Sequence, residues 1–158
     1  MSKERENKKL VPAIRFKGFT DDWEQRKLLT FVERVSKQRD NQSLPSVEYE
    51  DIQAGSGVLD KNFEQKKIHK RGIEFQKDDI LFGKLRPYLD NRLLATFKGI
   101  AVGDFWVLRP SGSTPGFVYA FIQSDHFQTL ANQTSGTKMP RSDWSKVSDE
   151  EYRIPANV

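Results

Sequence analysis

Two short loops hold the residues of this chain whose chemistry suits an anionic partner. The first is KLRPYLDNR, Lys84–Arg92, and the second is SGTKMPR, Ser135–Arg141. Each combines lysine and arginine with a proline, whose ring fixes φ and stiffens the loop. Lysine and arginine neutralise phosphates, and arginine also donates two parallel hydrogen bonds to O6 and N7 of guanine. Together the two loops favour a surface that binds nucleic acid.

Two kinds of contact are expected from these segments. Arg86, Asn91, Thr137 and Arg141 are candidates for base edges in the major groove, because asparagine pairs with adenine as arginine does with guanine. Tyr88 offers a flat face or a hydroxyl group. The complete predicted set of DNA-contacting residues is Lys66, Lys67, Lys70, Arg71, Lys84, Arg86, Tyr88, Asn91, Arg92, Ser135, Thr137, Lys138 and Arg141.

A third basic segment precedes the first loop and contains Lys66, Lys67, Lys70 and Arg71. With Lys138, these side chains are expected mainly to hold phosphates. Phosphate contacts give affinity and a steep salt dependence, but they do not select a sequence.

The sequence contains no arrangement typical of catalysis or metal binding. His69 and His126 are the only histidines, neither has a partner at metal-ligand spacing, and cysteine is absent. Gly55–Gly57 lacks the third glycine of a dinucleotide loop, and Ser111–Gly116 lacks the lysine of a P-loop, so both are interpreted as turns. We therefore expect no metal, no cofactor, no small-molecule substrate and no enzymatic activity.

Size and charge narrow the class of protein. The 158 residues are enough for one domain with its own core. We expect a charged, disordered tail at 1–10 and a single domain at 11–158. The net charge of +4 permits a nucleic-acid partner without requiring one. The first residues do not resemble a signal peptide and no apolar run is long enough to span a bilayer, so we expect a soluble protein. The absence of cysteine fits a reducing compartment, and we expect a cytoplasmic location.

The spacing of apolar residues predicts the strands and helices that must position the loops. The pattern indicates an α+β fold with a mixed, largely antiparallel twisted sheet and a few short helices. Strands are expected at 80–82, 93–97, 100–102, 105–108 and 152–154. Helical structure is expected from Pro115 to about Asn132, with a second helix beginning at Ser124. The apolar residues between Leu28 and Val35 follow helical spacing and predict a short helix, with a strand as the alternative.

Six aromatic residues lie within these apolar, periodic segments, and we expect them in the core rather than exposed for base stacking. They are Phe105, Trp106, Phe117, Tyr119, Phe121 and Phe127. Single-stranded nucleic acid requires exposed aromatic faces for base stacking. The pattern therefore favours binding to a duplex.

Several segments resemble, in order along the chain, the specificity subunits of bacterial type I restriction–modification systems. None of them is a strict motif, and the resemblance depends on their joint occurrence over nearly the whole chain. The segments are VPAIRFKGFTDDWEQRKL (Val11–Leu28), DDILFGKLRPYLDNRLL (Asp78–Leu94), GIAVGDFWVLRP (Gly99–Pro110), SGTKMPRSDW (Ser135–Trp144) and YRIP (Tyr152–Pro155).

This resemblance implies a single amino-terminal target-recognition domain that reads one half of a split DNA sequence. In the family, such a domain is followed by a long spacer helix; the sequence reaches Val158 without the glutamine-rich beginning of that helix. The implied partners are double-stranded DNA, a methyltransferase subunit and a restriction subunit. The implied role is in DNA methylation and host defence, with all catalysis in the partner subunits.

Other functions are compatible with the same residues. One is a protein-interaction or regulatory fragment of the same complex that does not bind DNA independently. A small enzyme with an unrecognised site and an RNA-binding module are two more. Binding assays that compare duplex DNA, RNA and acidic proteins distinguish these functions.

Overall fold

The computed structural model describes residues 12, 14, 17, 21–40, 43–60, 62–65 and 69–158. The expected tail at 1–10 lies outside this part of the chain. Twelve strands, three α-helices and four short 3₁₀ turns make up the described elements. The strands are β1 (Glu24–Lys27), β2 (Val32–Val35), β3 (Gln38–Arg39), β4 (Ser46–Val47), β5 (Ile52–Gln53), β6 (Val58–Leu59), β7 (Gly72–Phe75), β8 (Ile80–Gly83), β9 (Arg92–Leu94), β10 (Gly99–Ala101), β11 (Phe105–Pro110) and β12 (Glu151–Ile154). The helical elements are η1 (Leu28–Thr30), η2 (Tyr49–Asp51), η3 (Phe63–Gln65), η4 (Pro87–Leu89), α1 (Pro115–Phe121), α2 (Asp125–Ala131) and α3 (Trp144–Asp149).

The strands form two four-stranded sheets and two two-stranded ribbons. The sheets have the orders β3-β7-β10-β4 and β2-β11-β8-β9, and the ribbons pair β1 with β12 and β5 with β6. All pairs are antiparallel except β10 with β4. The expected α+β fold with a mixed, largely antiparallel sheet is therefore confirmed.

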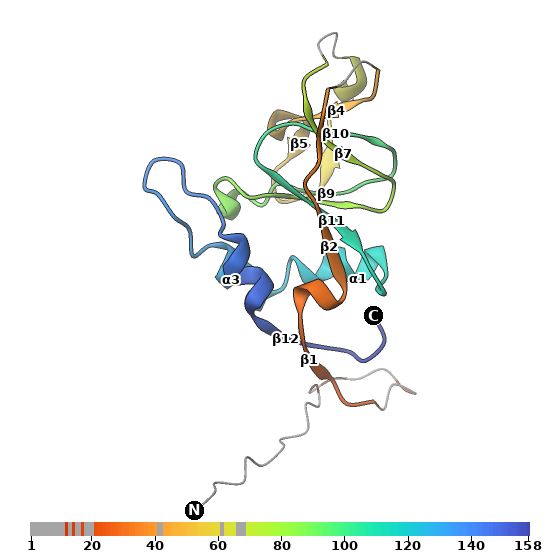
Figure 1. Cartoon of the computed structure of the whole chain (residues 1–158), viewed down its shortest axis with the longest axis vertical. Helices are drawn as coiled ribbons and strands as arrows, with labels where there is room; N and C mark the ends of the chain where they lie inside the picture. Colours follow the sequence, from red (N-terminus) through yellow and green to blue (C-terminus); the bar gives the residue numbers. More distant parts are fainter. Residues whose placement is uncertain are drawn as a thin grey trace, which may run out of the picture.

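The β2-β11-β8-β9 sheet is buried on both faces. Successive side chains of a strand point to opposite faces. Along β11, Phe105 and Val107 pack into a cluster shared with the other sheet, whereas Trp106 and Leu108 pack against the helices. This explains why β8 and β11 are continuous apolar runs rather than alternating ones. The sheet is the middle layer of the molecule, between the second sheet and the helices (Figure 1).

Two helices begin where the sequence predicts. Thr114 accepts a hydrogen bond from Phe117 N and caps α1, whose first residue is Pro115. Ser124 caps α2 in the same way by accepting from Phe127 N. The break between the two helices allows both to turn apolar side chains toward the sheet.

The helix expected between Leu28 and Val35 is wrong, and the alternative of a strand is correct. Leu28 lies in the turn η1, and Val32 and Val35 lie on β2, which pairs with β11. Val32 packs in the helix-side cluster and Val35 on the opposite side, as residues three apart on a strand must. A turn followed by a strand thus reproduces apolar spacing that is typical of a helix.

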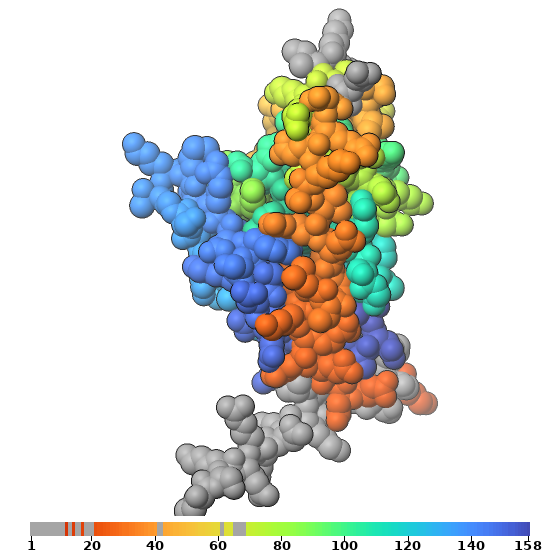
Figure 2. Space-filling model, viewed as in Figure 1, coloured from red at the N-terminus to blue at the C-terminus, as the bar shows by residue number. Residues whose placement is uncertain are grey.

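Figures 1 and 2 show that the segment between α2 and α3 projects from one side of the molecule. In Figure 1 the turn η4, which follows β8, lies on the same side. Both predicted loops are therefore carried by ordered elements: the first joins β8 to β9 and the second joins α2 to α3.

A buried ion pair joins the start of β8, the strand that leads into the first loop, to β11. Asp79 precedes β8 and is almost completely buried, and its carboxylate accepts from Arg109 Nε at 2.9 Å and from Nη2 at 2.8 Å. The same carboxylate accepts from the backbone N–H of Gln76 at 2.8 Å. The hydrogen bond to Asp79 raises the pKa of Arg109.

Replacing Arg109 should reveal the cost of leaving this carboxylate buried without its partner. We expect Arg109→Ala to lower the free energy of unfolding by about 3 kcal/mol, because a buried charge is then uncompensated. Urea unfolding measures the change. Arg39→Ala, which removes a surface ion pair to Glu74 at 2.8 Å, is the matched control and should cost less than about 1 kcal/mol. Equal costs for the two variants would contradict the assignment.

Candidate nucleic-acid interface

The first loop, between β8 and β9, is compact because backbone geometry restricts it at both ends. A Cβ on Gly83 would lie 2.9 Å from the Cβ of Asn91, so only glycine permits this approach of the two strands. Arg86 and Asp90 flank η4 with φ values of +48° and +55°. Non-glycine residues with positive φ are uncommon and require support from surrounding contacts.

The second loop is closed at its base by a pair of hydrogen bonds. Ser135 and Arg141 exchange backbone N–H to carbonyl bonds, both at 3.2 Å. Gly136 has a φ of +85°, which allows the chain to turn immediately after this pair. Beyond the pair, the N–H of Ser142 donates to the carbonyl of Lys84 at 2.8 Å, so the base of the second loop is tied to the first.

The two loops lie side by side. Leu85 and Arg141 form an antiparallel bridge, and the N–H of Arg86 donates to the carbonyl of Pro140 at 2.7 Å. The guanidinium of Arg86 also reaches the carbonyl of Lys138 at 3.5 Å. The expectation that these distant segments form one surface is confirmed by these contacts.

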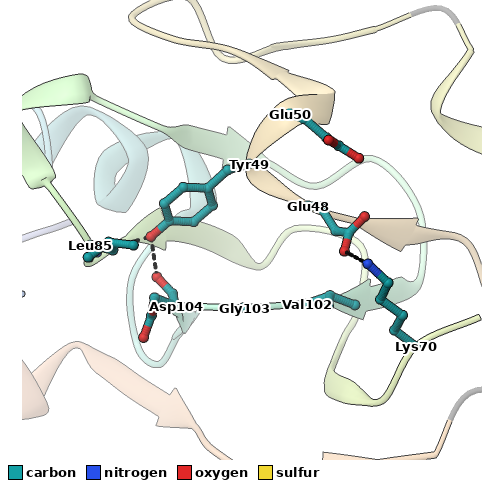
Figure 3. A pocket seen from close by; sticks show the side chains of 8 residues that line it. All are labelled: Glu48, Tyr49, Glu50, Lys70, Leu85, Val102, Gly103 and Asp104. Carbon is teal, nitrogen blue, oxygen red and sulfur yellow. Dashed lines mark hydrogen bonds and ion pairs between the residues drawn. The ribbon is translucent and has the colours of Figure 1, made fainter. Parts of the chain in front are cut away.

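Tyr49 and Asp104 support this junction from below. The Tyr49 hydroxyl donates to the carbonyl of Asp104 at 2.5 Å and accepts from Leu85 N–H at 3.0 Å (Figure 3). The Asp104 carboxylate accepts from Arg141 Nε at 3.0 Å and from Nη2 at 3.2 Å. Segments from three parts of the chain, around residues 49, 85 and 104, are thus joined to the second loop.

Burial of Tyr49 and pairing of Arg141 change the pKa of these two side chains. Burial raises the pKa of Tyr49 from 10.0 to about 12. The hydrogen bond to Asp104 raises the pKa of Arg141, with the carboxylate charge acting in the same direction. The raised pKa of Tyr49 keeps its phenol neutral, so the hydroxyl can donate to the Asp104 carbonyl. The raised pKa of Arg141 keeps its guanidinium charged, as the ion pair with Asp104 requires.

The expected base contact of Arg141 stays a prediction, because one edge of its guanidinium already holds Asp104. Nε and Nη2 donate to the Asp104 carboxylate, while the Arg141 side chain remains 43% exposed. Its remaining Nη1 lies 3.5 Å from the carbonyl of Met139, within its own loop. Arg141 therefore positions the loop.

Two further predicted contacts lie inside the domain. Asn91 is 7% exposed, so most of its side chain is shielded from solvent, and its expected contact with adenine stays a prediction. The Arg92 side chain is 12% exposed; it pairs with Asp90 and donates to the carbonyl of Gly55 at 3.0 Å. Its guanidinium also lies 5.8 Å from the centre of the Tyr119 ring. Arg92 therefore ties the first loop to the turn after β5, and its expected contact with DNA stays a prediction.

The basic segment before the first loop is only partly described. Lys66 and Lys67 lie outside the described residues, so their expected phosphate contacts stay predictions. Lys70 pairs with Glu48 at 2.7 Å, and the exposed Arg71 pairs with Asp40 at 3.3 Å. Both side chains are at the surface, but each already has an acidic partner.

The remaining candidates lie on the outer side of the two loops, where Lys84 is half-buried and the others are exposed. No acidic side chain pairs with Lys84, Arg86 or Lys138 in the part of the chain that the structure describes. The acids nearest in the loops and the adjoining turn, Asp90 and Asp104, are paired with arginines that position the loops. The exposed face is completed by Tyr88, Ser135 and Thr137. We call Lys84, Arg86, Tyr88, Ser135, Thr137 and Lys138 the loop face.

Sequence reasoning missed two residues of this region. Tyr49 supports the junction from a distant part of the chain, and no local pattern indicates its contact with residues 85 and 104. Met139 is 50% exposed at the end of the second loop. An apolar residue between Lys138 and Pro140 in a polar loop is a signal that could have identified it.

A shallow hollow lies beside Tyr49, with a volume of about 390 Å³. Figure 3 shows Glu48, Glu50 and Asp104 around it, with Lys70 bonded to Glu48. Its acidic lining opposes an anion, so the loop face and not this hollow is the candidate for phosphate contact.

Within the described ranges, no group of three or more histidine, cysteine, aspartate or glutamate residues is arranged to hold a metal ion. Among the same residues, no helix has both the length and the apolar character needed to cross a membrane.

Comparison with known proteins identifies the fold. No family model matches the chain, and no curated protein matches its sequence significantly. Two solved structures match over 85% of this chain. The HsdS subunit from Thermoanaerobacter tengcongensis has a TM-score of 0.65 and 20% identity. A structure that addresses complex assembly and conformational transition of the type I R-M system has a TM-score of 0.64 and 21% identity.

These neighbours are specificity subunits of type I restriction–modification systems, and the described chain has the fold of one part of them. The chain spans 38% of the length of each matched chain. The likeness agrees with the expected single target-recognition domain.

The Tyr49 hydroxyl should contribute measurably to stability. Tyr49→Phe leaves Leu85 N–H and the Asp104 carbonyl without their shared partner, and we expect a loss of about 1–2 kcal/mol in the free energy of unfolding. Urea unfolding at neutral pH measures this loss. Tyr88→Phe, at a phenol that is 65% exposed, should leave stability unchanged.

The raised pKa of Tyr49 also predicts how the stability of the Tyr49→Phe variant changes with pH. The folded state holds the phenol proton more tightly, so this contribution to stability is complete below pH 10 and is lost as pH rises toward 12. Tyr49→Phe should therefore lose less stability than the unmodified chain between pH 10 and 12. An identical alkaline decline in both proteins would contradict the buried phenol.

Proposed function

We propose that this chain is a sequence-specific DNA-binding module of a type I restriction–modification system. It reads one half of a bipartite target through the loop face. The main support is the junction of the two loops on a fold shared with specificity subunits. Among the described residues, Lys84, Arg86 and Lys138 have no acidic partner there. Preorganised cations on one surface are the electrostatic requirement for binding a polyanion.

The proposed division of labour within the loop face follows from geometry. Arg86 is the candidate for a guanine contact, because its guanidinium has no carboxylate partner among the described residues and its backbone is held by Pro140. Lys138 and Lys84 hold phosphates, and Thr137 and Ser135 donate to phosphate or base edges. Three residues are proposed to position the loops: Arg141, Arg92 and Asn91.

The module contributes recognition and not chemistry. Methyl transfer and DNA cleavage are proposed to be carried out by methyltransferase and restriction subunits. This chain directs those subunits to the DNA sequence that it binds. DNA methylation and host defence are the corresponding cellular roles, in the cytoplasm.

Selection from a random pool of duplex DNA at low salt tests the proposal. The chain should enrich a short common sequence, since low salt strengthens phosphate contacts. Single-stranded DNA and duplex RNA of the same sequence are competitors that should bind more weakly. Enrichment of no sequence, or capture of RNA in preference to DNA, would reject the proposed function.

Arg86→Ala should relax sequence choice at one position of the enriched target. We expect a loss of about 1–3 kcal/mol in discrimination at that base pair. Competition between the target and its single-base variants measures this loss. Arg86→Lys keeps the charge without the planar fork, so it should restore overall affinity but not the discrimination. Uniform weakening for all sequences would remove Arg86 from base recognition.

Lys138→Ala should weaken binding to every sequence alike. Because one phosphate contact is lost, the slope of log affinity against log salt concentration should fall by about one. Titrations at several salt concentrations measure the slope. Lys98→Ala, which removes an exposed lysine paired with Glu74 at 3.0 Å, is the control and should leave the slope unchanged. A slope unaffected by Lys138→Ala argues against a phosphate contact.

A further inference from the structure

Apolar side chains are concentrated on the same two loops. Among the described residues, six large hydrophobic side chains are exposed, and Tyr88, Leu89 and Met139 account for three of them. Single exposed apolar side chains are common on any protein surface and need no explanation. Tyr88, Leu89 and Met139 are instead grouped on two adjoining loops beside unpaired cations. Such a group requires an explanation, because grouped apolar side chains on a surface mark binding sites.

The exposure of Met139 follows from a backbone that is held in place. The Met139 carbonyl lies 3.5 Å from Arg141 Nη1, and the turn at Gly136 approaches the same carbonyl. Arg141 is held in turn by Asp104. The loop thus fixes the Met139 backbone and leaves its side chain half in solvent.

Tyr88 is held in a similar way on the neighbouring loop. It lies in the middle of η4, whose turn is closed by a bond from Leu89 N–H to the Arg86 carbonyl at 2.9 Å. The Arg86 N–H donates to the carbonyl of Pro140, the residue after Met139. Tyr88 and Met139 are therefore presented from two loops that share one backbone junction.

The charges around these side chains select the class of ligand. Lys138 directly precedes Met139, and Arg86 lies two residues before Tyr88. Neither cation has an acidic partner in the described part of the chain. An apolar group next to unpaired cations suits a polyanion that also carries an apolar group. The thymine 5-methyl group is the apolar group that duplex DNA presents in the major groove.

We propose that Met139 and Tyr88 contact thymine 5-methyl groups and are specificity-determining residues of this module. This inference rests on the proposed function and adds an apolar component to its hydrogen-bonding contacts. Methionine suits such a contact because its unbranched, polarisable side chain adapts to the shape of its partner. The target should therefore contain thymine at one position or more opposite these loops.

Replacing thymine with uracil in the enriched duplex tests the inference, because this change removes only the methyl group. At one position or more, we expect the unmodified chain to bind the uracil duplex about fourfold more weakly, the equivalent of one methyl group left unburied. Met139→Ala or Tyr88→Ala should abolish this preference at its own position. Met139→Leu and Tyr88→Phe keep apolar contact and should retain it. Leu29→Ala, at a 59% exposed leucine of η1, is the matched control and should leave the preference unchanged.

The outcomes separate this inference from the proposed function. Enrichment of no duplex rejects the proposed function and this inference with it. An enriched duplex that lacks thymine, or that binds equally well with uracil, rejects the inference alone. A thymine preference that survives both alanine variants rejects it as well. If both variants leave DNA binding unchanged but lose a methyltransferase subunit in co-purification, the apolar residues serve a protein contact and the inference is wrong.

Discussion

Strands β8 and β11 pair antiparallel in the middle of the molecule, and their side chains alternate between two hydrophobic clusters. This pairing fixes where the loops emerge. Phe105 is opposite Gly83, so the turn containing Asp104 and the beginning of the first loop lie at the same end of the strand pair. Because apolar burial on both faces fixes the register, a slip of one residue would exchange the two faces of each strand. The position of the loop face is thus a consequence of core packing.

The second loop reaches the same end of the sheet from the helical layer. It leaves α2, returns into α3 and forms a bridge with the first loop at Leu85 and Arg141. Asp104 and Tyr49 then connect this bridge to the strands below it. A surface made of loops is therefore ordered before any ligand arrives. Preorganisation of this kind reduces the conformational entropy lost on binding.

Much of this architecture could be predicted from the sequence. The apolar strands β8 and β11, the caps at Thr114 and Ser124, and the strand β12 are local features with clear patterns. The element around residues 28–35 was predicted wrongly, because a 3₁₀ turn joined to a strand gives the same apolar spacing as a helix. The choice between them depends on pairing with β11, about 75 residues later in the chain, which no local pattern contains.

The sequence by itself determined that the two loops are cationic, stiffened by proline and flanked by apolar elements, since composition and periodicity are local properties. Only the tertiary structure decided which cations face solvent. Arg92 and Arg141 resemble Arg86 in sequence, yet they are occupied by Asp90 and Asp104, and Asn91 is buried. The physical reason is that an ion pair depends on the distance between side chains in the folded chain. The pairing of Arg141 joins residues 37 positions apart, and folding alone brings them together.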